Sequence, residues 1–140
     1  MIPLVHLVPL LPMKKILIVE DDPSISLLYQ KAFTFEGFEV TTSFDGAGVY
    51  EQVLKTPPSI ILLDIILPTV NGLQVLAKLK GDPTTAQIPV IMLSNLDGMK
   101  EIDEAIALGA VKYITKGNYE PAQVVALVKK ILENVTAGMQ

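Results

Sequence analysis

The sequence contains no cysteine, no tryptophan and no arginine, and its one histidine is His6. Without cysteine the chain can form no disulfide, hold no thiolate-bound cluster and perform no thiol chemistry. A single histidine makes a histidine-based zinc site a poor expectation. Eleven lysines face fifteen acidic residues, which gives a net charge of −4, and arginine is the usual reader of base edges. We therefore expect no direct binding to nucleic acid.

The length and the apolar content suit one folded domain. The chain has 140 residues, of which half are hydrophobic. A chain of this size buries about two thirds of the surface that its unfolded form exposes. We expect the domain to cover residues 13–136, with a short C-terminal tail over residues 137–140.

Residues 1–12, MIPLVHLVPLLP, are apolar and contain three prolines. This stretch is shorter than the roughly 20 residues that span a bilayer, and it lacks the basic start of a secretory signal. We expect an N-terminal extension outside the domain, with Met13 as a natural start. The alternative is an extended arm that packs on the domain or on a partner, and deleting it would then lower the stability.

Five short segments have the patterns of β-strands. Three are continuous apolar runs, typical of strands that are covered on both faces in a parallel sheet, over residues 16–19, 60–63 and 90–93. Two are interrupted by polar residues and are expected at the edges of the sheet, over residues 38–42 and 111–114.

Between these segments, apolar residues recur at the three- and four-residue spacing of amphipathic helices. Asp22 and Pro23 have the types expected at the N-cap and in the first turn of the first helix, and Gly37 has the type expected at its end. The helical stripes cover residues 25–33, 47–54, 75–79, 99–106 and 124–135.

This alternation predicts an α/β fold with a doubly wound, five-stranded parallel sheet and helices on both faces, a flavodoxin-like three-layer sandwich. With the second and fifth strands at the edges, the strand order is 2-1-3-4-5. In this order a ligand crevice lies at the carboxyl ends of strands one and three, where the winding direction reverses.

Acidic, hydroxyl and lysine side chains follow the predicted strands at this edge: Glu20, Asp21 and Asp22, then Asp64, Ser94 and Lys116. Crowded carboxylates repel one another unless a cation compensates, and oxygen ligands suit Mg²⁺ or Mn²⁺. Such a site can place a phosphoryl group on Asp64, with Ser94 and Lys116 holding phosphoryl oxygens. Taken singly, each residue could instead be a helix cap or a solvated side chain.

These segments resemble the receiver domain of two-component response regulators, of the stand-alone, single-domain type. The resemblance covers residues 14–135 and rests on KILIVEDDPSI, IILLDIILPTVNG, PVIMLSN and GAVKYITK, in this order. It implies a cytoplasmic switch that accepts a phosphoryl group from a histidine kinase or phosphotransfer protein and then changes its binding to an unknown output protein. It implies no membrane binding, and no enzymatic activity beyond the protein's own phosphorylation and dephosphorylation.

The resemblance also implies a role for each matching residue. Asp64 is the phosphoacceptor, and Ser94 and Lys116 assist the reaction. The implied ligands of Mg²⁺, or of Mn²⁺ in its place, are Glu20, Asp21, Asp64 and the carbonyl of Ile66. Ser94 and Tyr113 form the implied switch pair, although Tyr113 could simply pack on an edge strand. The exposed charges of the last two helices either select partners or are merely solvated.

Three features depart from the family pattern. Gly117 follows Lys116 where the family usually has a proline, and we expect a trans peptide bond there. Ile66 and Leu96 occupy the two positions that tune water access to the phosphoryl group. Apolar side chains cannot orient an attacking water by hydrogen bonding, so we expect a long-lived phosphoryl group. We also expect no output domain after the last predicted helix.

Three other functions remain open. An aspartyl phosphatase of the haloacid-dehalogenase type needs a second acid two residues after its nucleophile. Ile66 occupies that position, which argues against this function. A flavin- or nucleotide-binding domain would need a Gly- or hydroxyl-rich loop after strand one, where the sequence has EDDPS. A degenerate receiver would act as a phosphate-independent adaptor. The intact set of acid, hydroxyl and lysine argues against an adaptor, whereas Gly117 leaves room for it.

Overall fold

The computed structural model describes residues 13–138. The predicted extension, residues 1–12, and the last two residues of the predicted tail, 139–140, lie outside the described residues. Within residues 13–138, no helix combines the length and the apolar character that crossing a membrane requires.

Five parallel strands alternate with five helices. The strand order is β2-β1-β3-β4-β5, which confirms the doubly wound fold and the order predicted from the sequence. The strands are β1 (Lys15–Val19), β2 (Glu39–Ser43), β3 (Ile60–Leu63), β4 (Val90–Ser94) and β5 (Lys112–Thr115). The helices are α1 (Pro23–Phe35), α2 (Val49–Lys55), α3 (Gly72–Lys80), α4 (Met99–Ala107), a short 3₁₀ helix (Lys116–Asn118) and α5 (Pro121–Gly138).

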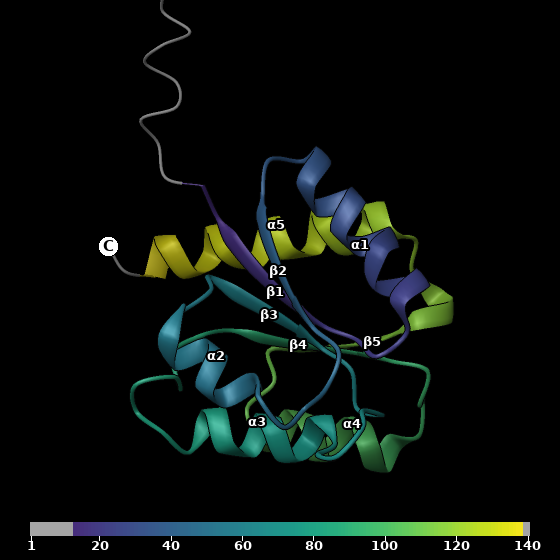
Figure 1. Cartoon of the computed structure of the whole chain (residues 1–140), viewed down its shortest axis with the longest axis vertical. Helices are drawn as coiled ribbons and strands as arrows, with labels where there is room; N and C mark the ends of the chain where they lie inside the picture. Colours follow the sequence, from purple (N-terminus) through teal and green to yellow (C-terminus); the bar gives the residue numbers. More distant parts are fainter. Residues whose placement is uncertain (1–12, 139–140) are drawn as a thin grey trace, which may run out of the picture.

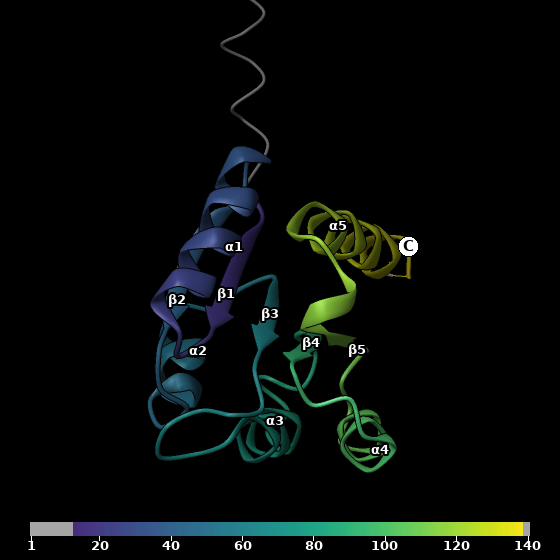
Figure 2. The same cartoon turned by 90° about the vertical axis from the view of Figure 1, so that its right-hand side faces the viewer.

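The sheet lies between two helical layers. Helices α1 and α5 cover one face, and α2, α3 and α4 cover the other (Figures 1 and 2). Side chains of β1 alternate between the two cores: Ile16 and Ile18 pack under α1 and α5, and Leu17 and Val19 pack on the opposite side. Because both faces are buried, the strand has a continuous apolar run instead of an alternating pattern.

The two edge strands are more exposed, as the sequence predicts. Every residue of β2 is exposed or half-buried, and in β5 only Ile114 is fully buried. Both strands begin one residue later than their sequence patterns indicate. Phe38, which precedes β2, is buried, and its ring packs edge-on against Phe33 with the ring centroids 5.1 Å apart. Phe38 therefore contributes to the core from outside the strand.

Side-chain caps fix where two of the helices begin. The Oδ1 atom of Asp22 accepts hydrogen bonds from the backbone N–H groups of Ser24 at 2.8 Å and Ile25 at 3.3 Å, which confirms the predicted N-cap. Asn71 and Gln74 form a reciprocal capping box at the start of α3. The two caps lie in the loops after β1 and β3, so they set the paths of both loops at the predicted crevice.

Gly72 opens α3 where the chain passes close to the backbone of Asp64. Its N–H group donates to the carbonyl of Ile65 at 2.8 Å. A Cβ atom on Gly72 would lie 1.9 Å from the carbonyl oxygen of Asp64 and 2.7 Å from its carbonyl carbon. Backbone atoms cannot move aside as the end of a flexible side chain can. Only glycine therefore allows α3 to begin against Asp64.

We expect Gly72→Ala to destabilise the protein by about 1–3 kcal/mol, the range of overpacked sites, because α3 or the Asp64 segment must shift. Urea unfolding followed by circular dichroism measures the change. Gly48→Ala is the control, since nothing lies within 4 Å of its Cβ position, and it should change the stability by less than about 0.5 kcal/mol. Equal stabilities of the two variants would contradict the close approach.

Candidate functional site

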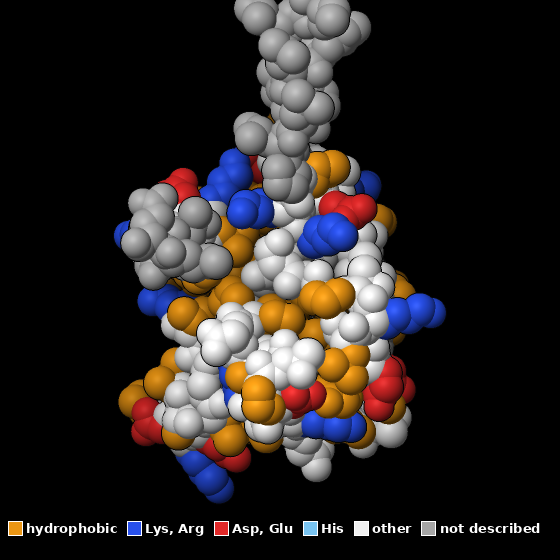
Figure 3. Space-filling model, turned by 90° about the vertical axis from the view of Figure 1, so that its left-hand side faces the viewer, with side chains coloured by type: hydrophobic (Ala, Val, Ile, Leu, Met, Phe, Trp, Pro, Cys, Tyr) orange, Lys and Arg blue, Asp and Glu red, His pale blue; other side chains and the backbone are white. Residues whose placement is uncertain are grey.

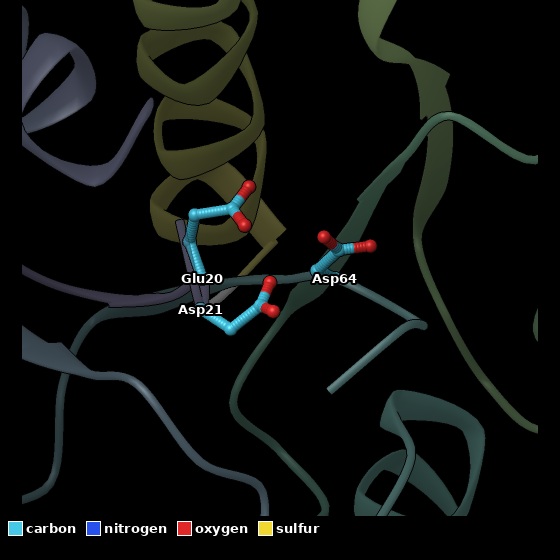
Figure 4. Close-up of side chains that lie close together, drawn as sticks. All are labelled: Glu20, Asp21 and Asp64. Carbon is cyan, nitrogen blue, oxygen red and sulfur yellow. The ribbon is translucent and has the colours of Figure 1, made fainter. Parts of the chain in front are cut away.

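Three carboxylates gather at the carboxyl ends of β1 and β3. Glu20 and Asp21 follow β1, Asp64 follows β3, and the register places Val19 beside Leu63. One carboxylate oxygen from each acid lies within 4.8 Å of the other two, and Figure 4 shows the three side chains at neighbouring strand ends. Glu20 and Asp64 are buried, whereas Asp21 is exposed. The structure thus brings the predicted acids together and leaves one open to solvent.

Lys116 reaches this acidic cluster from beyond β4. It begins the 3₁₀ helix after β5, and its ammonium group donates to Oδ2 of Asp64 at 2.7 Å and to Oε1 of Glu20. The side chain of Lys116 is only 11% exposed. The sequence predicts that Lys116 lies beside Asp64. It gives no signal for the contact with Glu20, which depends on the conformation of a long side chain.

Burial and charge pairing act against each other in the cluster. Burial raises the pKa of Glu20, although hydrogen bonds from Lys116 and from the N–H group of Asp22 lower it. Burial lowers the pKa of Lys116, but its hydrogen bonds to Asp64 and Glu20 outweigh this effect, so the pKa is raised overall. Lys116 therefore keeps its proton at neutral pH and compensates one of the negative charges.

The remaining charge and the donor atoms suit a divalent cation. When all four groups are ionised, three carboxylates and one ammonium group leave two uncompensated negative charges. All the available donors are oxygen atoms, the ligands that Mg²⁺ prefers and Mn²⁺ accepts. The residues present therefore fit a magnesium site built on Glu20, Asp21 and Asp64. That the carbonyl of Ile66 is a further ligand of the ion stays a prediction.

Ser94 ends β4 at the same edge of the sheet. The register pairs Leu63 with Met92, so Ser94 lies one position further along its strand than the residue level with Asp64. Ser94 is fully buried, and its Oγ atom accepts a hydrogen bond from the N–H group of Leu96 at 3.2 Å. The Ser94 hydroxyl is thus linked to the loop that leads from β4 to α4.

Tyr113 connects β5 to the same loop. Its ring is half-buried and packs against the core below α3 and α4, and its hydroxyl donates to the carbonyl oxygen of Leu96. Burial raises the pKa of Tyr113, and the nearby Ser94 side chain partly offsets this. Tyr113 packs on an edge strand, as the simpler interpretation expects, but it also reaches the β4–α4 loop. Its role in switching stays a prediction.

The two apolar positions near the acids differ in exposure. Ile66 is 59% exposed, and its N–H group donates to Oδ1 of Asp64 at 3.3 Å. Leu96 is half-buried and packs against the core on the α3 and α4 side. Neither side chain has a polar atom, so neither can orient a water molecule beside Asp64.

The segment after Lys116 has ordinary peptide geometry. Residues 13–138 contain no cis peptide bond, so the bond to Gly117 is trans, as predicted from the sequence. Nothing lies within 4 Å of the position of a Cβ atom on Gly117. Lys116 reaches Asp64 with glycine in the place of the usual proline.

A second loop borders the site, and the sequence analysis did not identify it. The N–H group of Glu20 donates to the carbonyl of Ser43 at 3.1 Å, and Oδ2 of Asp45 accepts from Oγ1 of Thr69 at 3.1 Å. Thr69 has a φ of 67°, which is uncommon for a β-branched residue. These contacts tie the loop after β2 to β1 and to the loop after β3. No residue pattern could reveal them, because a threonine does not signal left-handed backbone.

Known proteins that are similar to this chain are response regulators. Residues 16–129 match the family model described as the response regulator receiver domain. The response regulator PleD of Caulobacter vibrioides is 37% identical over 102 residues, which are 73% of this chain and 22% of PleD. The DNA-binding dual master transcriptional regulator RpaA of Synechocystis sp. is 34% identical over 120 residues, which are 86% of this chain and 49% of RpaA. The chain thus spans half or less of the length of these relatives.

Solved structures share the fold. A CheY-like response regulator receiver domain protein from Methanospirillum hungatei superposes with a TM-score of 0.85 at 24% identity, covering 91% of this chain and 99% of that chain. At this identity the likeness concerns the fold alone. The phosphorylated cyanobacterial phytochrome response regulator RcpA superposes with a TM-score of 0.76 at 34% identity, covering 87% of this chain and 93% of that chain.

We expect Mg²⁺ to raise the thermal stability, and Asp21→Asn to remove most of this effect, because Asp21 contributes an exposed carboxylate to the cluster. At a Mg²⁺ concentration 100 times the Kd, single-site linkage gives a stabilisation of about 2.7 kcal/mol. Differential scanning fluorimetry with and without Mg²⁺ measures the shift in Tm.

Asp22→Asn is the matched control for this prediction. Asp22 is the next acid along the chain, but its carboxylate caps α1, and asparagine is an equally good cap. The shift with Mg²⁺ should therefore equal that of the unaltered protein. An equal loss in both variants, or no shift in the unaltered protein, would count against a metal site at Asp21.

Proposed function

Because the chain belongs to the receiver domain family of two-component response regulators, we propose that it is a signalling switch with Asp64 as its phosphoacceptor. A histidine kinase or phosphotransfer protein supplies the phosphoryl group in a Mg²⁺-dependent reaction, and the chain then changes its binding to an output partner. It catalyses only its own phosphorylation and dephosphorylation. The cytoplasmic location expected from the sequence is part of this proposal.

The observation that carries the proposal is the buried ion pair of Asp64 and Lys116 beside two further acids. The Nζ atom of Lys116 lies 2.7 Å from Oδ2 of Asp64, and Glu20 and Asp21 stand next to them. Several carboxylates held this close are unfavourable for folding unless positive charge compensates. A cation bound beside these carboxylates would compensate their charge, and the site could then accept an incoming phosphoryl group.

Asp64 is the nucleophile in this proposal. One of its carboxylate oxygens forms an O–P bond as the P–N bond of a phosphohistidine breaks, and the released imidazole takes up a proton. The ammonium group of Lys116 stabilises negative charge on the transferring group, and the hydroxyl of Ser94 donates a hydrogen bond to a phosphoryl oxygen. Glu20, Asp21 and Asp64 would hold a Mg²⁺ ion, which would supply further positive charge to the reaction.

The loop after β4 carries the effect towards the surface. The Oγ atom of Ser94 accepts from the N–H group of Leu96 at 3.2 Å, and the carbonyl of Leu96 accepts from the hydroxyl of Tyr113. When the hydroxyl of Ser94 turns to a phosphoryl oxygen, its contact with the N–H group of Leu96 changes. The contact of the Leu96 carbonyl with Tyr113 is then affected as well. A dianionic group on Asp64 thereby biases the loop between two arrangements.

The face formed by α4, β5 and α5 is the proposed binding surface for the output partner. It carries the exposed apolar side chains of Met99 and Ile106. The charged side chains along α4 and α5 include Lys100, Glu101, Asp103, Glu104, Lys129 and Lys130. Among them, Lys129 pairs with Glu36 of α1 at 2.6 Å. Lys129 therefore serves the contact between α1 and α5, and the others remain the candidates for selecting a partner.

The phosphate-independent adaptor is the alternative function. Gly117 is the departure that leaves room for it, since the family usually has proline there. Lys116 nevertheless contacts both Asp64 and Glu20, so the contacts of the site are present with glycine at position 117. Residues 16–129 match the response regulator receiver domain, which supports a phosphorylated switch. We therefore favour the phosphorylated switch.

Incubation with acetyl phosphate and Mg²⁺ is expected to add one phosphoryl group per chain, measured by intact-mass spectrometry. Asp64→Asn should abolish the addition because an amide is not a comparable nucleophile, and chelation of Mg²⁺ should do the same. Asp103→Asn, at an exposed acid of α4, is the control and should be phosphorylated normally. An adaptor would gain no phosphoryl group in any sample. Unchanged addition in Asp64→Asn would show that the phosphoacceptor is another residue.

The phosphoryl group is expected to be long-lived, because Ile66 and Leu96 offer no polar atom to an attacking water. Ile66→Asn and Leu96→Glu should each speed dephosphorylation several-fold, measured as the loss of phosphoryl mass after the donor is removed. Leu54→Asn, at an exposed position of α2, should leave the rate unchanged. A rapid loss in the unaltered protein that neither substitution alters would refute the explanation.

A further inference from the structure

The loop after β3 contains a strained turn. The N–H group of Val70 donates to the carbonyl of Pro68 at 2.7 Å, and Thr69 between them has a φ of 67°. A hydrogen bond that closes over a single residue of positive φ forms a γ-turn of the rare and strained kind. The branched side chain of Thr69 makes a positive φ still less favourable. Such a conformation persists only where the surrounding structure holds it.

Packing restrains the chain on both sides of this γ-turn. Leu67 and Val70 pack on the core beneath α2, α3 and α4. A Cβ atom on Gly46 would lie 2.0 Å from the carbonyl oxygen of Val70, so the backbones of the two loops are in close contact. A γ-turn brings its end residues together, and relaxation of Thr69 to an extended conformation would separate them. Because Val70 lies against Gly46, we expect the displacement to fall on Leu67 and on Ile66 before it.

Asp45, in the loop after β2, contacts the γ-turn through the side chain of Thr69. Its Oδ2 atom accepts from Oγ1 of Thr69 at 3.1 Å, and its Oδ1 atom accepts from the N–H group of Ala47 at 2.8 Å. On the face shown in Figure 3, acidic and lysine side chains alike lie mainly towards the periphery. Three surface acids pair with lysines: Glu36, Glu39 and Glu51. Within residues 13–138 no lysine forms an ion pair with Asp45, so its carboxylate serves the two loops instead.

Asp45 is tied to the other side of the acidic cluster as well. The Oγ atom of Ser43 donates to the carbonyl of Asp45 at 2.9 Å, and the carbonyl of Ser43 accepts from the N–H group of Glu20 at 3.1 Å. Hydrogen bonds therefore run from Glu20 through Ser43 and Asp45 to Thr69. They join the loops after β1, β2 and β3 at the edge of the sheet where the acids gather.

We propose that Asp45 is a positioning residue of the phosphorylation site and acts through Thr69. It holds the loop after β3 in the arrangement in which the N–H group of Ile66 donates to Oδ1 of Asp64 at 3.3 Å. Lys116 contacts the other oxygen of this carboxylate, so the two contacts together fix its orientation. Asp45 is not one of the three acids that would hold the ion, and its effect on Mg²⁺ and on phosphoryl transfer rests on the proposed function.

Three substitutions at Thr69 distinguish a strained turn that Asp45 holds from a loop that merely packs. Thr69→Val removes the hydroxyl group and keeps the branched shape, so the turn stays strained and loses its contact with Asp45. Thr69→Ser keeps the hydroxyl group and should behave as the unaltered protein does. Thr69→Gly also removes the hydroxyl group, but glycine adopts a positive φ without steric cost. The turn should therefore persist in Thr69→Gly without the contact.

Calorimetric titration with Mg²⁺ measures the affinity of the site separately from the reaction. Removal of a group that orients metal ligands typically lowers the affinity about 10–100-fold. We expect Thr69→Val and Asp45→Ala each to raise the Kd of Mg²⁺ about tenfold, whereas Thr69→Ser and Thr69→Gly leave it nearly unchanged. Combined with Thr69→Gly, Asp45→Ala should have little further effect, because the turn no longer needs to be held.

Amide hydrogen exchange at Ile66, followed by NMR without Mg²⁺ or a phosphodonor, tests the positioning itself. Thr69→Val and Asp45→Ala should each speed this exchange several-fold, because the contact of Ile66 with Asp64 opens more often. Thr69→Ser and Thr69→Gly should leave the exchange close to that of the unaltered protein.

Thr84→Val is the matched control, since it makes the same change at an exposed threonine of the loop after α3. The N–H group of Thr84 also donates to an aspartate, to Oδ1 of Asp82 at 2.9 Å. This variant should alter neither the Kd of Mg²⁺ nor the exchange at Ile66.

An unchanged Kd and an unchanged exchange rate in Thr69→Val would overturn the proposal, as would equal losses in Thr69→Val and Thr69→Gly. An effect of Asp45→Ala that is undiminished in the Thr69→Gly background would also overturn it. If the unaltered protein binds no Mg²⁺ and gains no phosphoryl group, the proposed function fails. The exchange at Ile66 then decides by itself whether Asp45 holds the loop.

Discussion

The contact of Lys116 with two buried carboxylates is the feature on which the site depends. The parallel strands β1 and β3 end at one edge of the sheet, which brings Glu20, Asp21 and Asp64 together. Like charges this close oppose folding unless they are compensated. Lys116 compensates part of the charge from beyond β4. The fold therefore brings three carboxylates together at the crevice, and the ammonium group of Lys116 compensates one of their charges.

Backbone geometry holds the crevice in shape around these charges. Gly72 allows α3 to begin against the carbonyl of Asp64, and Asp22 caps α1 directly after the acidic pair. Thr69 and Asp45 join the loops after β3 and β2. The walls of the crevice around Asp64 are thus held by backbone and capping contacts, while hydrogen bonds at Leu96 link the β4–α4 loop to Ser94 and Tyr113.

Much of the fold, and part of the site, could be predicted from the sequence. Continuous apolar runs mark the three buried strands, and polar interruptions mark the two edges, which together constrain the order and make 2-1-3-4-5 the natural one. Asp64 and Lys116 could be placed together because residues after parallel strands share one edge. The contacts of Lys116 with Glu20 and of Tyr113 with Leu96 could not be predicted, because they depend on side-chain rotamers. The left-handed backbone at Thr69 has no signature in residue type or periodicity.

The proposed function requires one divalent cation among Glu20, Asp21 and Asp64, with Lys116 on the other side of Asp64. Anomalous X-ray scattering from a crystal soaked in Mn²⁺ would locate such an ion without reference to activity. We expect a single strong peak between the carboxylates of Asp21 and Asp64, with Lys116 still in contact with Asp64. A peak elsewhere, or no peak at a saturating concentration of Mn²⁺, would contradict the assignment of this site.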